Sequence, residues 1–180
     1  PPLSSPLSDG SASWNAVIED AMTIWNSNLA AVRLAATRDS TAAVGEGNSV
    51  NNVVFSTSVY GTPWGSRVLG LTLQRYDTRT NRYSEADVLF NSGVRWDSYR
   101  GALRSQGGES MNDFRRVAIH ELGHALGLNH PDDIGQTVGK VPGKILEIGS
   151  NDGTFLKRAM LSCGECLGLE PAQNLAKIAN

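Results

Sequence analysis

The chain has 180 residues, 40% of them hydrophobic, and a formal net charge of −2 with a sequence pI near 5.9. This length allows one sizeable core with at most a fragment of a second domain. Because the basic residues are scattered, we expect no nucleic-acid partner and no membrane-surface partner. No apolar run approaches the roughly 20 residues that span a bilayer.

The elements alternate between helical and strand-like patterns. Residues 1–13 are rich in Pro and Ser and are predicted to be a flexible leader. Residues 14–28 place apolar side chains at helical spacing behind Ser13, a good N-cap. Short apolar runs then predict strands at 30–36, 51–59, 67–76 and 85–91, and the last two form a hairpin around the turn "DTRTN". A second helix is predicted from Asn112 until Gly127 stops it.

The composition changes near Gly139. Residues 1–138 contain eleven Arg and no Lys, whereas residues 139–180 contain four Lys and one Arg. A shift of this kind marks a boundary. We therefore expect two pieces of different origin to meet there, and one uninterrupted fold is the alternative.

All three histidines of the chain lie in the stretch "AIHELGHALGLNH". His120 and His124 are four residues apart on the predicted helix, so their imidazoles share one face. Gly127 lets the chain turn back and bring His130 as a third neutral nitrogen ligand. Three protein ligands and an open position describe a catalytic zinc site, and Glu121 is placed to act as general base toward the zinc-bound water. Single core histidines would not explain the pattern H-E-x-x-H-x-x-G-x-x-H.

This stretch resembles the zinc signature of the metzincin metallopeptidases, and residues 14–138 resemble the matrixin-like branch in the order of their elements. The segments "VLGLTLQRY" and "EADVLFNSGVRW" resemble that family's edge strand and the strand and Trp that follow it. The resemblance implies a metzincin-like α+β fold: a twisted, mixed five-stranded sheet with an antiparallel edge strand and two long helices.

The resemblance also implies functional roles. It implies His120, His124 and His130 as zinc ligands, Glu121 as catalytic base, and an edge strand around Gly70 and Leu71 that pairs with an extended polypeptide substrate. It implies a secreted protein, and we expect a monomer. Where many matrixins carry acidic calcium ligands, this chain has Asn91, Ser92 and Gly93, so Zn²⁺ is the only metal that we predict. The methionine turn that lies beneath the zinc in metzincins has one candidate, Met160.

The sequence pattern of the tail, residues 139–180, predicts a strand, a Gly-rich turn, a helix, a strand and a helix in that order. It resembles the opening of a class I S-adenosylmethionine-dependent methyltransferase, which implies Gly149 and Gly153 in a cofactor loop and Glu170 at a ribose. The later strands of such a domain are missing, so we expect an incomplete Rossmann-like βαβ segment. In this interpretation Met160 is an ordinary helix residue.

The sequence therefore predicts a zinc-dependent metalloendopeptidase that hydrolyses peptide bonds. Two alternatives remain: a zinc-binding but inactive remnant of a metzincin, or a cofactor-binding fragment of the methyltransferase type.

Overall fold

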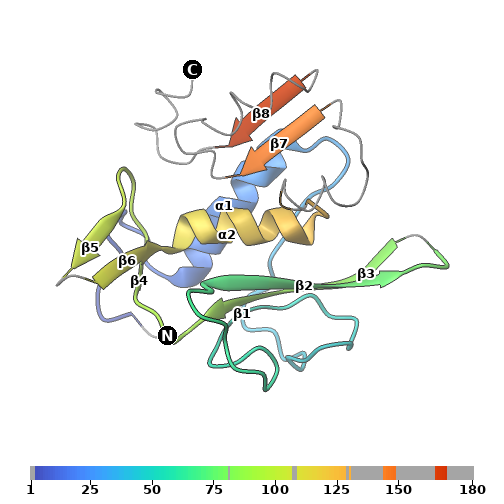
Figure 1. Cartoon of the computed structure of the whole chain (residues 1–180), viewed down its shortest axis with the longest axis horizontal. Helices are drawn as coiled ribbons and strands as arrows, with labels where there is room; N and C mark the ends of the chain where they lie inside the picture. The colour runs from blue at the N-terminus through green and yellow to red at the C-terminus, as the bar shows by residue number, and fades with distance from the viewer. Residues whose placement is uncertain are drawn as a thin grey trace.

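The computed structural model contains two helices and eight short strands in the part of the chain that it describes, residues 3–80, 82–106, 109–128, 130, 144–148 and 165–169. Figure 1 shows the two helices crossing above a three-stranded sheet. The elements in chain order are α1 (Trp14–Asn28), β1 (Val53–Ser56), β2 (Gly70–Asp77), β3 (Arg82–Asn91), β4 (Trp96–Asp97), β5 (Arg104–Gln106), β6 (Glu109–Asp113), α2 (Phe114–Ala125), β7 (Lys144–Ile148) and β8 (Glu165–Leu169).

Helix α1 begins where the sequence predicts a helix. The Ser13 hydroxyl accepts a hydrogen bond from the Ala16 amide at 3.1 Å, as an N-cap does. The buried side chains of α1 are Val17, Ile18, Ala21, Met22 and Trp25. The Trp25 indole N–H donates to the carbonyl of Ile119 at 2.9 Å, so α1 is tied to α2 by a fully buried hydrogen bond.

The main sheet has the strand order β1-β3-β2. Strand β1 is parallel to β3, whereas β2 is antiparallel to it and forms the edge, as the hairpin pattern predicts. Val88, Leu89 and Phe90 on β3 are each at most 1% exposed. Phe90 meets Phe114 of α2 with ring centroids 4.6 Å apart, which joins the sheet to the helix layer.

The prediction of a five-stranded sheet is wrong. Among the described residues, β1-β3-β2 and β4-β6-β5 form two separate three-stranded sheets, and residues 30–36 form no strand. The physical reason lies at Leu34, whose amide donates to the Asn26 side-chain oxygen at 2.7 Å and whose carbonyl accepts from the Asn26 amide at 2.8 Å. A helix side chain thus takes the place of a neighbouring strand for this apolar run.

The segment ahead of α1 makes specific contacts. Leu7 is buried in the core. The Ser8 amide donates to Asp97 at 3.0 Å, and the Asp9 amide donates to the carbonyl of Ser98 at 2.9 Å. These contacts join the described part of the expected leader to the end of β4 and to the residue that follows it.

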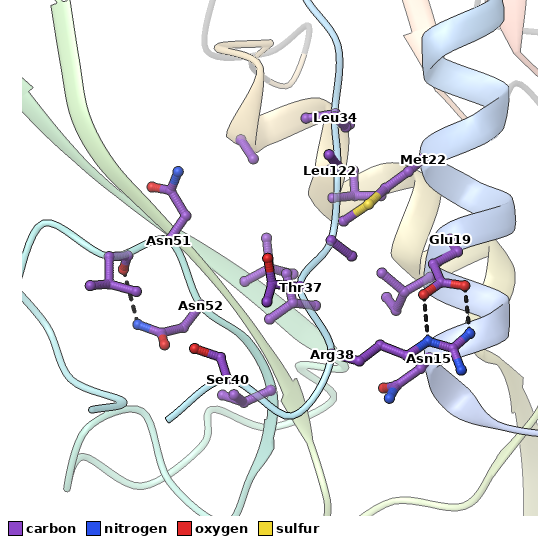
Figure 2. Close-up of a pocket in the computed structure, with 18 of the residues that line it drawn as sticks. Asn15, Glu19, Met22, Leu34, Thr37, Arg38, Ser40, Asn51, Asn52 and Leu122 are labelled. Carbon is purple, nitrogen blue, oxygen red and sulfur yellow. Dashed lines mark hydrogen bonds and ion pairs between the residues drawn. The ribbon is translucent and has the colours of Figure 1, made fainter. Parts of the chain in front are cut away.

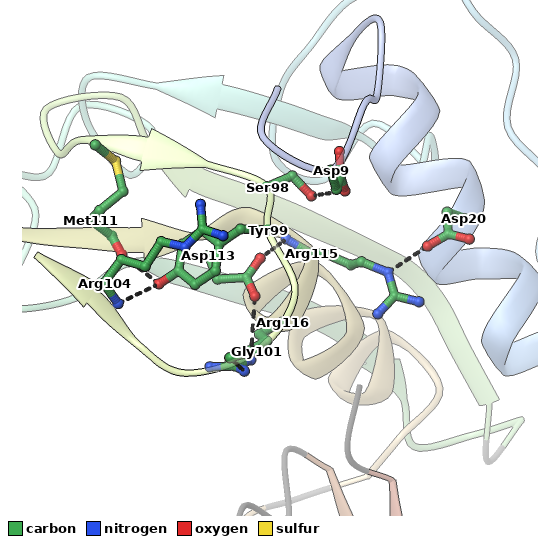
Figure 3. A network of polar contacts seen from close by, with 10 residues as sticks. All are labelled: Asp9, Asp20, Ser98, Tyr99, Gly101, Arg104, Met111, Asp113, Arg115 and Arg116. Carbon is green, nitrogen blue, oxygen red and sulfur yellow. Dashed lines mark hydrogen bonds and ion pairs between the residues drawn. The ribbon is translucent and has the colours of Figure 1, made fainter. Parts of the chain in front are cut away.

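A polar network holds the start of α2 (Figure 3). The Asp113 carboxylate caps the helix by accepting from the Arg115 amide at 3.2 Å, and it pairs with Arg116 at 3.3 Å. Arg115 reaches across to Asp20 on α1. Burial raises the pKa of Asp113, and the charge of Arg116 opposes that rise.

Strands β7 and β8 pair in parallel, with Lys144 opposite Glu165 and Ile148 opposite Leu169. Both lie where the tail pattern predicts strands. A parallel pair requires a crossover connection, as a βαβ unit has.

Among the described residues, neither helix has the length and apolar character needed to cross a bilayer.

Candidate metal centre and active site

Three histidine nitrogens converge at the C-terminal half of α2. The Nε2 atom of His124 lies 3.1 Å from that of His120 and 3.2 Å from that of His130. The Nε2 atoms of His120 and His130 are 3.1 Å apart, which closes the triangle. The structure therefore brings together all three predicted ligands through the same ring nitrogen.

The end of α2 explains how His130 returns to the helix. The Gly127 amide donates to the carbonyl of His124 at 2.7 Å, and the Leu128 amide donates to that of Gly123 at 3.1 Å. This pair of bonds is the Schellman motif, which needs a left-handed residue after the helix. Gly127 supplies it with a φ of 91°, and a Cβ there would lie 3.2 Å from Cε2 of Tyr83.

The second ring nitrogen of His124 fixes its tautomer. Nδ1 lies 2.6 Å from the carbonyl oxygen of Leu128, which can only accept, so Nδ1 donates this bond. In the neutral ring, Nε2 is then the nitrogen with the lone pair. Burial lowers the pKa of His120 to about 4, and positive charge on His124 and His130 acts in the same direction. His120 is therefore neutral near pH 7, the protonation state that a metal ligand needs.

These nitrogens fit a zinc ion. Tetrahedral zinc with Zn–N distances of about 2.0–2.1 Å separates two nitrogen ligands by about 3.3–3.4 Å. The spacings of 3.1–3.2 Å are close to that value. Lone pairs at this distance repel one another unless a cation or a proton lies between them. The donor set of three imidazoles is one that zinc prefers.

Glu121 lies beside the histidines and faces strand β2. It is 5% exposed, and its Oε2 accepts a hydrogen bond from the Thr72 hydroxyl at 2.8 Å. A Cβ on Gly70 would lie 2.9 Å from Cγ of Glu121, so the absence of a side chain at Gly70 makes room for the carboxylate. Burial raises the pKa of Glu121, whereas the bond from Thr72 and the nearby His124 oppose that rise.

Strand β2 runs along α2, as Figure 1 shows. The Gln74 side-chain amide donates to the carbonyl of His124, so β2 holds the helix at two points, Glu121 and His124. Sequence reasoning missed Thr72 and Gln74. The alternation of side chains along a strand gave the available signal, because residues 70, 72 and 74 share one face.

The Asn91 side chain links the ends of neighbouring strands. Its side-chain amide donates to the carbonyl of Val68 at 3.0 Å, and its side-chain oxygen accepts from the Gly93 amide at 2.9 Å. The Ser92 amide donates to Ser56. These bonds close the ends of β1, β2 and β3 around one asparagine.

The other predicted site residues, Met160, Gly149, Gly153 and Glu170, lie outside the described residues.

A separate cavity of about 680 Å³ lies between α1, residues 34–44 and the start of β1 (Figure 2). Leu122 and Ala125 of α2 line it, but the histidines do not, and the Glu19–Arg38 ion pair bounds it. This cavity is distinct from the histidine site.

The helix-borne histidine pair, the returning third histidine and the adjacent glutamate define a domain of the metallopeptidase type. A model of the peptidase family described as matrixin matches residues 10–141. The match covers most of the chain, so the protein belongs to the matrixin family, whose members are metallopeptidases that use zinc and act on polypeptides. No curated protein and no solved structure matches the chain.

Proposed function

We propose that this protein is a zinc-dependent metalloendopeptidase in which His120, His124 and His130 hold the metal and Glu121 is the general base. The observation that carries the proposal is the triangle of three Nε2 atoms at 3.1–3.2 Å with a buried glutamate beside it. When bound, zinc supplies Lewis-acid polarisation of a peptide carbonyl and lowers the pKa of water.

The chain's own residues supply the proton transfer. Glu121 takes a proton from the attacking water and passes it to the leaving amine, as a positioned carboxylate does in general acid–base catalysis. Its raised pKa, caused first by burial, brings it closer to neutral pH and so favours both steps. The neutral form of His120 keeps its lone pair available for the metal.

The substrate is an extended polypeptide that adds to β2. Among the described residues, β2 pairs only with β3, so its other edge is free. The Leu69 carbonyl accepts from Asn91 on the β3 side, and backbone groups alternate in direction along an antiparallel strand. The amides and carbonyls of Gly70 and Thr72 therefore point to the free edge, whereas those of Leu71 face β3. Such outward groups allow a substrate to pair as an added strand. Secretion would bring the enzyme to extracellular polypeptides.

Hydrolysis of a quenched-fluorescent unfolded protein by the zinc-loaded chain tests this function. We expect cleavage that is lost on chelation and reduced by about 10²–10⁴-fold in Glu121→Ala, the usual contribution of a general base. Zinc content measured beside the assay shows whether the variant still holds its metal. Equal cleavage by Glu121→Ala and the parent would refute the assigned base.

Two other functions give different results. A zinc-binding protein without activity would hold one zinc and cleave nothing. A methyltransferase-type fragment would bind S-adenosylmethionine through residues 139–180, and the parallel pairing of β7 with β8 favours this second function. Equilibrium dialysis with that cofactor, run beside zinc retention, separates the two.

A further inference from the structure

Two residues of the edge strand hold the Glu121 side chain from one side. Thr72 Oγ1 lies 2.8 Å from Oε2 of Glu121 and 2.9 Å from its backbone carbonyl oxygen. Two residues earlier, the backbone of Gly70 packs so closely that an added Cβ would lie 3.0 Å from Oε1. The Thr72 hydroxyl has one proton for its two acceptors, and the carboxylate oxygen is the nearer and the charged one. The glutamate side chain is thus held at its stem by Gly70 and at Oε2 by Thr72.

The hydroxyl of Thr72 differs from an ordinary surface hydroxyl in two respects. Its acceptor is a carboxylate, and hydrogen bonds to a charged acceptor are about twice as strong as neutral ones. The acceptor is also largely buried, because Glu121 is 5% exposed, so water does not readily replace the threonine. Among the described residues, Oε1 receives no hydrogen bond, which leaves that oxygen free to accept a proton.

We infer that Thr72 is a positioning residue of the peptidase reaction: its hydroxyl holds Oε2 of Glu121, so that Oε1 takes the proton of the attacking water. The inference rests on the proposed function, since it concerns the same base. Glutamate has three side-chain torsions, and a base held in one rotamer does not lose reactive geometry to the others.

The place of Thr72 on β2 links this role to substrate binding. Its backbone groups point to the free edge where we propose that substrate pairs, while its side chain points to Glu121. A change confined to the side chain should therefore affect kcat and leave KM nearly constant. A general disturbance of the strand would change both.

The test uses the zinc-loaded full chain and three variants. Thr72→Val removes the hydroxyl at nearly constant volume, and Thr72→Ser keeps the hydroxyl. Ser84→Ala is the matched control, because it removes a hydroxyl that donates to the Arg75 carbonyl at 3.2 Å on the same two strands, away from Glu121. Kinetics of peptide hydrolysis and zinc content are measured for each.

We expect Thr72→Val to lower kcat by about tenfold or more, as loss of a bond to a charged group does, with KM within about twofold of the parent. Thr72→Ser should recover most of the loss, and Ser84→Ala should match the parent. Equal kcat in Thr72→Val and the parent would overturn the positioning role, as would a loss that serine does not restore or that Ser84→Ala shares.

A second measurement is independent of activity. Urea unfolding of Thr72→Val, Glu121→Ala and the double variant gives the coupling between the two side chains. We expect the double variant to lose less stability than the sum of the single losses, and additive losses would overturn the contact itself. A parent that holds zinc and shows this coupling but cleaves no peptide would overturn the proposed function, and the positioning role with it.

Discussion

Replacing Gly127 by alanine tests how the turn after α2 builds the metal site. Gly127 has a φ of 91°, and the new Cβ would lie 3.2 Å from Cε2 of Tyr83. A side chain in the left-handed region costs about 1–2 kcal/mol. Tyr83 must also shift by a few tenths of an ångström, which its half-exposed position allows.

The strain sets the expected effect on zinc affinity. The zinc-free variant can relieve the strain by leaving the turn conformation, but zinc binding requires that conformation because it brings His130 to His120 and His124. The lost affinity then equals the strain, and 1–2 kcal/mol corresponds to about 5- to 30-fold weaker binding. Competition with a zinc-sensitive dye measures this loss directly.

Gly10→Ala is the matched control. Gly10 has a φ of 89°, nearly that of Gly127, and a Cβ there meets nothing within 4 Å. Gly10→Ala should lose about 1–2 kcal/mol in urea unfolding of the zinc-free chain. Gly127→Ala should lose less there, because the zinc-free variant relieves its strain by leaving the turn. Only Gly127→Ala should also lose zinc affinity, and an affinity equal to that of Gly10→Ala would refute the role of the turn in placing His130.

Three further outcomes follow from buried polar contacts. Trp25→Phe should lower the free energy of unfolding by about 2 kcal/mol, about half from the bond to Ile119 and half from lost buried area, measured in urea. Because burial raises the folded-state pKa of Asp113, its contribution to stability is present below an ordinary Asp pKa of about 3.9 and is lost as pH rises through the raised value. The stability difference between the parent and Asp113→Asn across pH 3–6 should show this direction, and a difference that runs the other way would contradict it. Burial, followed by the bond to Asp87, raises the pKa of Tyr60, so Tyr60→Phe should leave the ultraviolet titration of tyrosines near pH 10 unchanged.

Local sequence signals located much of the site. The spacing of His120 and His124 needs only one helical turn to place both rings on one face. Gly127 marks the helix end because few other residues adopt its φ. The Ser13 cap and the hairpin of β2 and β3 are likewise local, since their signals lie within a few residues of each other. These features were predicted correctly.

The partners of backbone groups were predicted less well. The apolar run at 30–36 has the composition of a strand, but the Asn26 side chain satisfies both backbone groups of Leu34. The β5–β6 hairpin was missed although Gly-Gly follows Gln106, a dipeptide typical of two-residue turns. Which segment satisfies a backbone group depends on all candidate partners in the folded chain, and composition alone does not rank them.

The sequence by itself determined the kind of site: three imidazoles, a neighbouring glutamate, and a glycine that turns the chain. Only the tertiary structure decided how these groups are held. It brought the Nε2 atoms to 3.1–3.2 Å, set the His124 tautomer through the Leu128 carbonyl, and placed Thr72 on Glu121. The spacing of residues along one helix follows from its fixed geometry, whereas contacts between β2 and α2 join residues about 50 positions apart and depend on how the whole core packs.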